Sequence, residues 1–226
     1  MRILAIDTVT EMCSVALSVQ GECIERQDMA INRHSNIVLG MIQAVLDEAG
    51  ISISQLDLIV NDVGPGSFTG IRIGMGVAQG LAYGADLPLL GVDALSILAQ
   101  GVADAHSGNI LAAIDARMGQ VYWAEFARQQ NALALQGELH LSHPGQVSGV
   151  AQGIYGTGSG WDTYTDVLQS QLDVCGYARD RFPLAGHALD CAAQMPESEW
   201  VRAGGLLPVY LRNDVAKVSA KSPLGK

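Results

Sequence analysis

The hydrophobic positions of this 226-residue chain follow two spacings that alternate along the sequence. Short stretches that are continuously apolar, or apolar at every second position, predict strands at 3–6, 13–19, 23–29, 56–63 and 88–92. Apolar residues at helical spacing predict helices over 36–49, from a glycine-rich loop to Gly84, and over 93–103. Strands interspersed with helices in this way indicate an α/β protein.

The second half of the chain opens as the first does. The run ILAAID at 110–115 resembles ILAID at 3–7, and an alternating strand at 121–126 follows a turn, with helices predicted near 162–171 and 184–195. The two aspartates that end these runs, Asp7 and Asp115, lie 108 positions apart, about half the chain. We predict a duplicated α/β unit, with a first subdomain at 1–106 and a smaller one, including the tail, at 107–226.

A glycine-rich loop, GPGSFTGIRIG at 64–74, stands between a predicted strand and a predicted helix. This order is typical of anion sites, because the backbone N–H groups at a helix start are unpaired. The loop is not a Walker sequence, since Thr69 stands at the second glycine position and no lysine follows. Thr69 also replaces the third glycine of the dinucleotide fingerprint, so the loop alone does not predict phosphate binding.

The helix after this loop is unusually rich in glycine. Gly70, Gly74 and Ala78 form one stripe, and Gly76, Gly80 and Gly84 form another. Each interior glycine costs about 1 kcal/mol against alanine, so we expect an offsetting close approach of another backbone. The predicted core face holds Gly70, Ile73, Gly74, Val77 and Leu81. The predicted partner face holds Arg72, Met75, Gly76, Gln79 and Tyr83. A single buried helix whose glycines serve only its own fold is the alternative.

Composition places the chain among globular proteins, with 49% hydrophobic and 16% charged residues. No apolar run approaches the roughly 20 residues of a membrane span, and the N-terminus has no signal-peptide pattern. Cys13, Cys23, Cys175 and Cys191 form no C-x-x-C pair, which favours reduced thiols over zinc or disulfides. We therefore predict a cytoplasmic protein without a metal site and without membrane contact.

The charge excludes direct, strong binding of nucleic acid. The net charge is −10, and lysine occurs only at Lys217, Lys221 and Lys226. An acidic body repels a nucleic-acid backbone, whose binding is mostly electrostatic. If a nucleic acid is the substrate, another protein must hold it.

Several segments resemble one family. They are ILAIDT at 3–8, RHS at 33–35, GPGSFTGIRIG at 64–74 continuing to QGLA at 79–82, and AIDARMGQVY at 113–122; the tail PVYLR at 208–212 also fits. Together they are similar to the bacterial TsaB (YeaZ) family. The resemblance implies a duplicated fold of the actin, sugar kinase and heat-shock ATPase superfamily with a reduced second half.

The resemblance also implies a role. Proteins of this family join a paralogue, TsaD, and a small ATPase, TsaE, to install threonylcarbamoyl on adenosine 37 of tRNAs that read codons starting with A. TsaD holds a metal through two histidines in a G-V-N-H-x-x-x-H segment. This chain reads GVDALSIL at 91–98, so Ala94 and Leu98 replace both histidines. We expect a non-catalytic, partner-binding subunit that meets tRNA only indirectly.

The same resemblance suggests where partners bind. A helical bundle with TsaD, or with a second copy when TsaD is absent, would use the glycine-striped helix, including Gly80, and the helix at 36–49. That second helix is apolar on a wide arc, which suits two contacts. Its candidate partner residues are His34, Ile37 and Met41, with His34 at the surface and Ser35 as the helix cap. In the tail, Tyr210 and Arg212 are typical interface anchors, and a strap on its own domain is the alternative.

Two aspartates are the weak candidates for a cofactor. In active superfamily members, Asp7 and Asp115 would face a bound phosphate and its magnesium; otherwise each caps a tight turn. We expect that the protein requires no cofactor, although ATP or ADP at a partner interface is compatible with the resemblance. The main alternative function is therefore a weak ATP-binding or nucleotide-hydrolysing enzyme. A glycoprotease-like peptidase is a poor third, because H-E-x-x-H and G-x-S-x-G are both absent.

Overall fold

The predicted strands of the first half form one mixed sheet in the computed structural model, which describes residues 1–129 and 132–212. The strands are β1 (Arg2–Asp7), β2 (Met12–Val19), β3 (Glu22–Met29), β4 (Leu58–Asp62) and β5 (Leu89–Val92). Their order is β3-β2-β1-β4-β5, with β2 antiparallel to both neighbours and β1, β4 and β5 parallel. All five residues of β4 are buried, as expected for a parallel strand covered on both faces.

The second half repeats this topology. Its strands are β6 (Ile110–Asp115), β7 (Val121–Gln129), β8 (Ala132–Ser142), β9 (Ile154–Thr157) and β10 (Val174–Ala178). Their order is β8-β7-β6-β9-β10, again with two antiparallel pairs followed by two parallel ones. The prediction of a duplicated α/β fold is confirmed.

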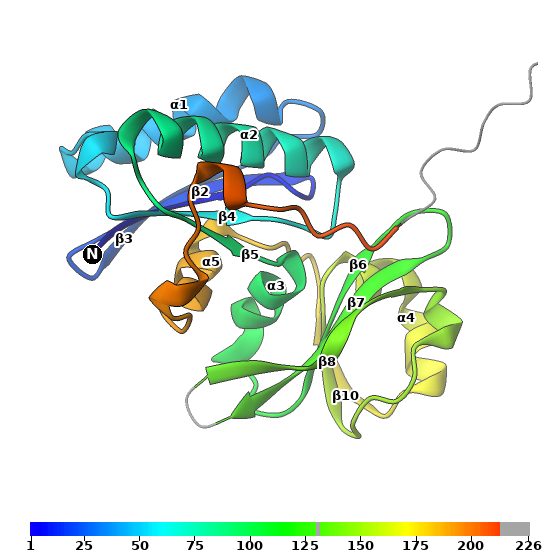
Figure 1. Cartoon of the computed structure of the whole chain (residues 1–226). Helices are drawn as coiled ribbons and strands as arrows, with labels where there is room; N and C mark the ends of the chain where they lie inside the picture. Colours follow the sequence, from blue (N-terminus) through cyan, green and yellow to red (C-terminus); the bar gives the residue numbers. More distant parts are fainter. Residues whose placement is uncertain (130–131, 213–226) are drawn as a thin grey trace, which may run out of the picture.

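Within residues 1–129 and 132–212, five α-helices cover the sheets, with short 3₁₀ helices at Ile53–Gln55, Pro144–Gln146, Glu197–Glu199 and Ala203–Gly205. They are α1 (His34–Ala49), α2 (Phe68–Ala85), α3 (Ala94–Ala103), α4 (Ser159–Gln171) and α5 (Ala185–Ala192). Figure 1 shows α1 and α2 side by side above the first sheet. The second half is reduced, because a loop with one 3₁₀ turn stands where the first half has α1.

The last helix of each half packs on the sheet of the other half. Helix α3 follows β5, yet Leu95, Leu98 and Val102 share a core with Ile110 and Phe126 of the second sheet. Helix α5 follows β10, yet it packs on the first sheet from the side opposite α1 and α2. The predicted second subdomain, 107–226, therefore contributes to both lobes (Figure 1).

The tail also returns to the first lobe. The Val209 N–H donates to the Val63 carbonyl at 2.8 Å, and Gln79 Nε2 donates to the Leu206 carbonyl at 3.3 Å. Figure 1 shows this segment running from the first lobe to the turn between β6 and β7. No helix among the described residues is long and apolar enough to cross a membrane.

Three local predictions are wrong. The buried face of α2 holds Ile71, Met75 and Ala78 with the first glycine stripe, so Met75 belongs to the core and not to the open face. His34 is 8% exposed rather than on the surface. Arg33, not Ser35, is the N-cap residue of α1, and no side chain caps that helix.

Candidate interlobe cleft and helical docking face

A cleft of about 750 Å³ lies between the lobes. It is lined by the turns that follow β1 and β6, by the start of α2, and by the tail. The strands that end in Asp7 and Asp115, β1 and β6, are the central strands of the two sheets, and the turns that follow both strands line this cleft. The cleft is therefore the first place to look for chemistry.

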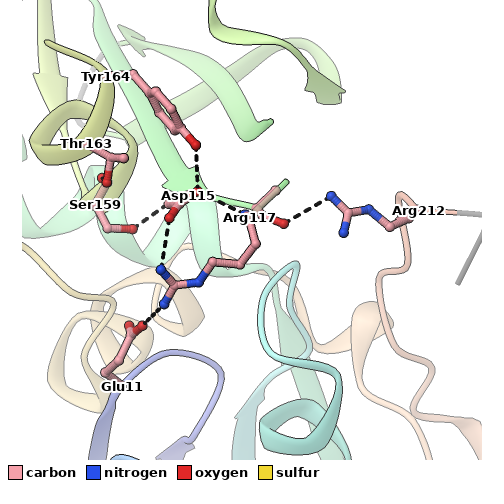
Figure 2. A network of polar contacts seen from close by, with 8 residues as sticks. Glu11, Asp115, Arg117, Ser159, Thr163, Tyr164 and Arg212 are labelled. Atoms are coloured by element: carbon pink, nitrogen blue, oxygen red, sulfur yellow. Dashed lines mark hydrogen bonds and ion pairs between the residues drawn. The ribbon is translucent and has the colours of Figure 1, made fainter. Parts of the chain in front are cut away.

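Asp115 holds the turn on the second-lobe side of this cleft. Its Oδ1 accepts from the Arg117 N–H at 2.9 Å and from the Tyr164 hydroxyl at 3.2 Å, and its own N–H donates to Ser159 Oγ at 3.1 Å (Figure 2). Arg117 Nη1 lies 3.1 Å from its Oδ2. Asp115 thus caps a tight turn and is occupied by groups of its own lobe.

Arg117 connects the two lobes. Figure 2 shows its guanidinium between Asp115 and Glu11, with Nη2 at 2.6 Å from Glu11 Oε1. Arg117 and Met118 both have left-handed backbone, with φ of 60° and 57°, and Gly119 follows at 73°. This turn aims the arginine across the cleft toward the first lobe.

Asp7 is completely buried, in contrast to Asp115. Its Oδ1 accepts from the Val9 N–H at 2.9 Å, and Oδ1 of the neighbouring Asp62 accepts from the Gly64 N–H at 2.7 Å. Among the described residues, neither Oδ2 has an N–H or hydroxyl donor. The two carboxyls hydrogen-bond to each other once one of them holds a proton. They therefore form a buried acid pair at the carboxyl ends of β1 and β4.

Burial governs the protonation of this pair. Loss of hydration raises the pKa of Asp7 to about 8, although the Val9 N–H and Asp62 lower it. The pKa of Asp62 is raised well above its usual value by burial and then by the charge of Asp7. Asp93, which caps α3 by accepting from Ser96, has a pKa raised by burial. This carboxyl cluster faces the protein interior and not the cleft.

Ala94 and Leu98 lie on α3 next to Asp93. Both side chains are buried, at 0% and 1% exposure, in the core formed with the second sheet. Leu98 Cδ2 occupies the space in which a Cβ at Gly158 would lie. In the part of the chain that the structure describes, no three His, Cys, Asp or Glu side chains are grouped to hold a metal.

The second candidate surface is the outer face of α1 and α2. Leu39 is 56% and Tyr83 is 85% exposed on it. The predicted residues Ile37 and Met41 are half-buried and pack partly on the core, whereas Arg72 is exposed. Gln79 is half-buried and holds the tail.

The two glycine stripes of α2 serve different purposes. A Cβ at Gly70 would lie 2.0 Å from the Thr8 carbonyl oxygen, and one at Gly74 would lie 2.6 Å from Thr8 Oγ1. These glycines let α2 pack against the end of β1. Gly76, Gly80 and Gly84 have nothing within 4 Å of the corresponding position. The second stripe is thus an open, shallow notch on the outer face.

A groove of about 910 Å³ continues this notch. It runs between the C-terminal half of α1, the 3₁₀ turn at 53–55 and the end of α2, where Gly80 and Gly84 form part of its floor. The outer face therefore combines exposed apolar side chains with a depression that another helix could enter.

Tyr210 and Arg212 strap the tail to the protein. Arg72 Nε donates to the Tyr210 hydroxyl at 3.3 Å, and the Tyr210 ring lies 5.7 Å from that of Phe68. Arg212 Nη2 donates to the Ala116 carbonyl at 3.0 Å and to Gln120 Oε1 at 2.8 Å. Tyr210 keeps 43% of its surface exposed, so it also remains accessible.

Several residues of the cleft and of the buried acid pair were not predicted from the sequence. Glu11, Asp62, Phe68 and Met118 were not singled out, and each lines the cleft or supports the buried acid pair. For Asp62 a signal existed, because it ends the strand that pairs in parallel with the strand of Asp7. Nothing local marked Glu11, since its partner lies 106 residues away.

Comparison with known proteins agrees with the fold. The family model for TsaD, tRNA N6-adenosine threonylcarbamoyltransferase, matches residues 19–165. The chain is 40% identical over 226 residues to the tRNA threonylcarbamoyladenosine biosynthesis protein TsaB of Escherichia coli K12, covering 96% of each, and 35% identical to that of Haemophilus influenzae, covering 94% of each. A solved structure of YeaZ from Pseudomonas aeruginosa is 37% identical, with a TM-score of 0.87, and the alignment covers 93% of this chain and 99% of that one.

Proposed function

This chain belongs to the TsaB (YeaZ) family, and we propose that it is a non-catalytic, partner-binding subunit required for threonylcarbamoylation of adenosine 37 in tRNAs that read codons starting with A. It acts with a TsaD-like catalytic paralogue and a TsaE-like ATPase, in the cytoplasm. Its own surface meets tRNA only indirectly, because a net charge of −10 opposes binding to the phosphate backbone. Without its paralogue, the chain pairs with a second copy.

The observation that carries the non-catalytic role is the burial of Ala94 and Leu98. They stand where the TsaD-like segment has its two metal-binding histidines, and here both are packed against the second sheet. A side chain that fills a core cannot reach a ligand in the cleft. Transfer chemistry of the TsaD kind therefore has no counterpart on α3.

The cleft does not suit a magnesium nucleotide bound in the manner of the superfamily. Asp7 has no exposed surface, and its carboxyl pairs with Asp62 instead of facing the cleft. Arg117 crosses the space between the lobes and is already paired with Glu11 and Asp115. Asp7 and Arg117 therefore do not fit a magnesium nucleotide in this cleft. ATP or ADP bound between this chain and a partner remains a separate proposal.

The outer face of α1 and α2 is the proposed contact with the paralogue. Leu39 and Tyr83 supply exposed apolar area, and the notch at Gly76 and Gly80 lets a partner helix approach closely. An apolar patch of this kind on a monomer marks a contact surface. The same face would be used in a homodimer, so the two assemblies exclude each other.

Reconstitution tests this proposal. Purified TsaD-like and TsaE-like proteins, with the enzyme that makes the threonylcarbamoyl donor, are given tRNA, with and without this chain, and modified adenosine is measured by mass spectrometry. We expect modification only when this chain is present. Full modification without it would refute the requirement. ATP hydrolysis by the isolated chain that is lost in Asp7→Asn would refute the non-catalytic role.

A further inference from the structure

The interlobe cleft is a hollow whose charged side chains are already paired within the protein. We propose that it binds an uncharged molecule whose ring carries several hydroxyl groups, either a sugar or a nucleoside. The volume of the cleft, about 750 Å³, lies in the range of small-molecule sites. The inference goes beyond the proposed function and does not depend on any partner protein.

The charges that line the cleft cancel. Among the described residues, the charged side chains of the lining are Glu11, Asp115, Arg117 and Arg212. Arg117 lies between the two acids, at 2.6 Å from Glu11 Oε1 and 3.1 Å from Asp115 Oδ2 (Figure 2). Arg212 donates to two oxygens of the β6–β7 turn. A charged ligand would break these contacts and would meet like charges as often as opposite ones, so the lining favours an uncharged ligand.

The polar atoms that lack a partner in this cleft are a ring nitrogen and a hydroxyl oxygen. His34 and Thr10 both line the cleft, and His34 is only 8% exposed. Within the part of the chain that the structure describes, neither His34 Nε2 nor Thr10 Oγ1 has a hydrogen-bond partner, although both atoms are buried. Buried polar atoms are almost always hydrogen-bonded, so two unpaired ones on the wall of a cleft indicate that a bound group satisfies them.

A hydroxyl group on the ligand suits both atoms. It can donate one hydrogen bond and accept others, so it matches an imidazole nitrogen or a threonine hydroxyl in either role. Carboxylates also accept from hydroxyls, and the described residues place Arg117 on Oε1 of Glu11 and no donor on Oε2. On the opposite wall, Ser159 Oγ accepts from the Asp115 N–H and donates to no other described residue. Both walls thus offer hydrogen bonds, as a molecule with several hydroxyls requires.

Much of the remaining lining is apolar and can cover the faces of a ring. Ile71 and Ile114 are buried, at 1% and 4% exposure, whereas Met118 and Tyr210 are 76% and 43% exposed. They come from α2, the end of β6, the β6–β7 turn and the tail. Small-molecule sites typically combine such apolar walls with a few polar groups that fix the orientation of the ligand.

The glycine loop does not provide a phosphate site on this ligand. A phosphate needs free backbone N–H groups, but the Gly64 N–H donates to the Asp62 carboxyl. The Ser67 N–H donates to the Val9 carbonyl at 2.7 Å, and Ser67 Oγ accepts from the Gly70 N–H. Because these donors are used within the chain, the cleft favours a sugar over a sugar phosphate and a nucleoside over a nucleotide.

Saturation-transfer difference NMR tests the proposal on the full-length protein. The probes are methyl β-glucopyranoside and adenosine, with glucose 6-phosphate and AMP as their charged counterparts. We expect saturable binding of at least one uncharged probe, with a Kd of roughly 0.1–10 mM, and weaker binding of its phosphorylated counterpart. Binding of the glucoside alone would identify a sugar site, and binding of adenosine alone would identify a nucleoside site.

Variants of the two unpaired wall residues locate the bound probe. Thr10→Val removes only the hydroxyl, and His34→Phe removes Nε2 while keeping an aromatic ring. Each should weaken binding about three- to tenfold, as expected for one lost hydrogen bond. His34→Gln should bind more tightly than His34→Phe, because its amide can replace the ring nitrogen. Thr69→Val is the matched control, since Thr69 is exposed on α2 and does not line the cleft.

Three results would overturn the proposal. The first is no binding of either uncharged probe at about 10 mM. The second is tighter binding of a phosphorylated counterpart, which would assign the cleft to an anion. The third is that Thr10→Val and His34→Phe bind as tightly as Thr69→Val while circular dichroism shows them folded. Leu39→Glu, on the α1–α2 face, should impair pairing with the paralogue and leave probe binding intact, so the two proposals can fail separately.

Discussion

Arg117 and Glu11 are 106 residues apart in the chain and form an ion pair at 2.6 Å across the interlobe cleft. The Arg117 side chain is 71% exposed and that of Glu11 is 36% exposed, so water screens the pair. It joins two lobes that are already held together by the exchanged helices α3 and α5. The pair therefore orients Arg117 more than it stabilises the fold.

A double-mutant cycle with Glu11→Gln and Arg117→Gln measures how strongly the Arg117–Glu11 ion pair stabilises the fold. We expect a coupling free energy of about 0.2–1 kcal/mol from urea unfolding, the range of exposed ion pairs. Arg202 and Asp86, paired at 2.8 Å with 79% and 92% exposure, provide the control cycle. A coupling above about 2 kcal/mol would mean that the Arg117–Glu11 pair is desolvated.

The two glycine stripes should respond oppositely to alanine. In Gly70→Ala the new Cβ would lie 2.0 Å from the Thr8 carbonyl, and because backbone cannot yield easily we expect a loss of roughly 1–3 kcal/mol. Gly80→Ala has open space on an exposed helix face, so a gain of up to about 1 kcal/mol is expected. Urea denaturation measures the free energy of unfolding of both variants. A change of the same sign in both would contradict the different roles assigned to the two stripes.

A larger side chain in the notch should block pairing without unfolding the chain. Gly80→Leu fills the depression where a partner helix would enter, and we expect loss of binding to the TsaD-like paralogue and a monomer by light scattering. Gly204→Leu is the matched control, because Gly204 also has nothing within 4 Å of its Cβ position and lies outside α1 and α2. Pairing that survives in Gly80→Leu would move the interface elsewhere.

The first sheet and the five helices of the described residues could be predicted from the sequence, because strand and helix periodicities are local. In the second sheet only β6 and β7 were predicted, since the strands β8, β9 and β10 lie beyond Phe126, where the pattern is weak. The resemblance of the motifs to one family then predicted the arrangement of these elements. The exchange of α3 and α5 could not be predicted, since which sheet a helix covers depends on the packing of the whole chain. The face of α2 was misjudged at Met75 because glycines on both sides weaken the amphipathic pattern.

The candidate site was predicted less completely, because the environment of its residues depends on the packing of the whole chain. Asp7 and Asp115 occupy equivalent turns, as the duplication indicates, yet one is buried with Asp62 and the other is bonded at the edge of the cleft. Burial distinguishes them, and burial is a property of the assembled lobes. His34 likewise reads as a surface residue until its loop is folded against the cleft.

The four thiols should differ in reactivity. Cys13 and Cys191 are buried or half-buried, and burial raises the pKa of each to about 12, so little thiolate forms at pH 8. Cys175 is exposed, and Cys23 is exposed with a pKa raised by partial burial and by Glu25. With iodoacetamide at pH 8 we expect Cys175 to be labelled first, then Cys23. Mass spectrometry that finds Cys13 or Cys191 labelled as fast as Cys175 would contradict the burial; labelling in urea is the control.

The buried acid pair should make stability fall as pH rises. The folded pKa of Asp7, about 8, lies above the roughly 4 of an unfolded aspartate, so between these values the folded chain holds a proton that the unfolded chain has released. The free energy of unfolding must therefore decrease through that window. Asp7→Asn keeps the acceptor for the Val9 N–H and removes this ionisation, so its stability relative to wild type should rise from pH 5 and level off above about pH 8. Urea midpoints measure it, with the exposed Asp86→Asn as control, and a profile parallel to wild type would show that Asp7 is not the titrating group.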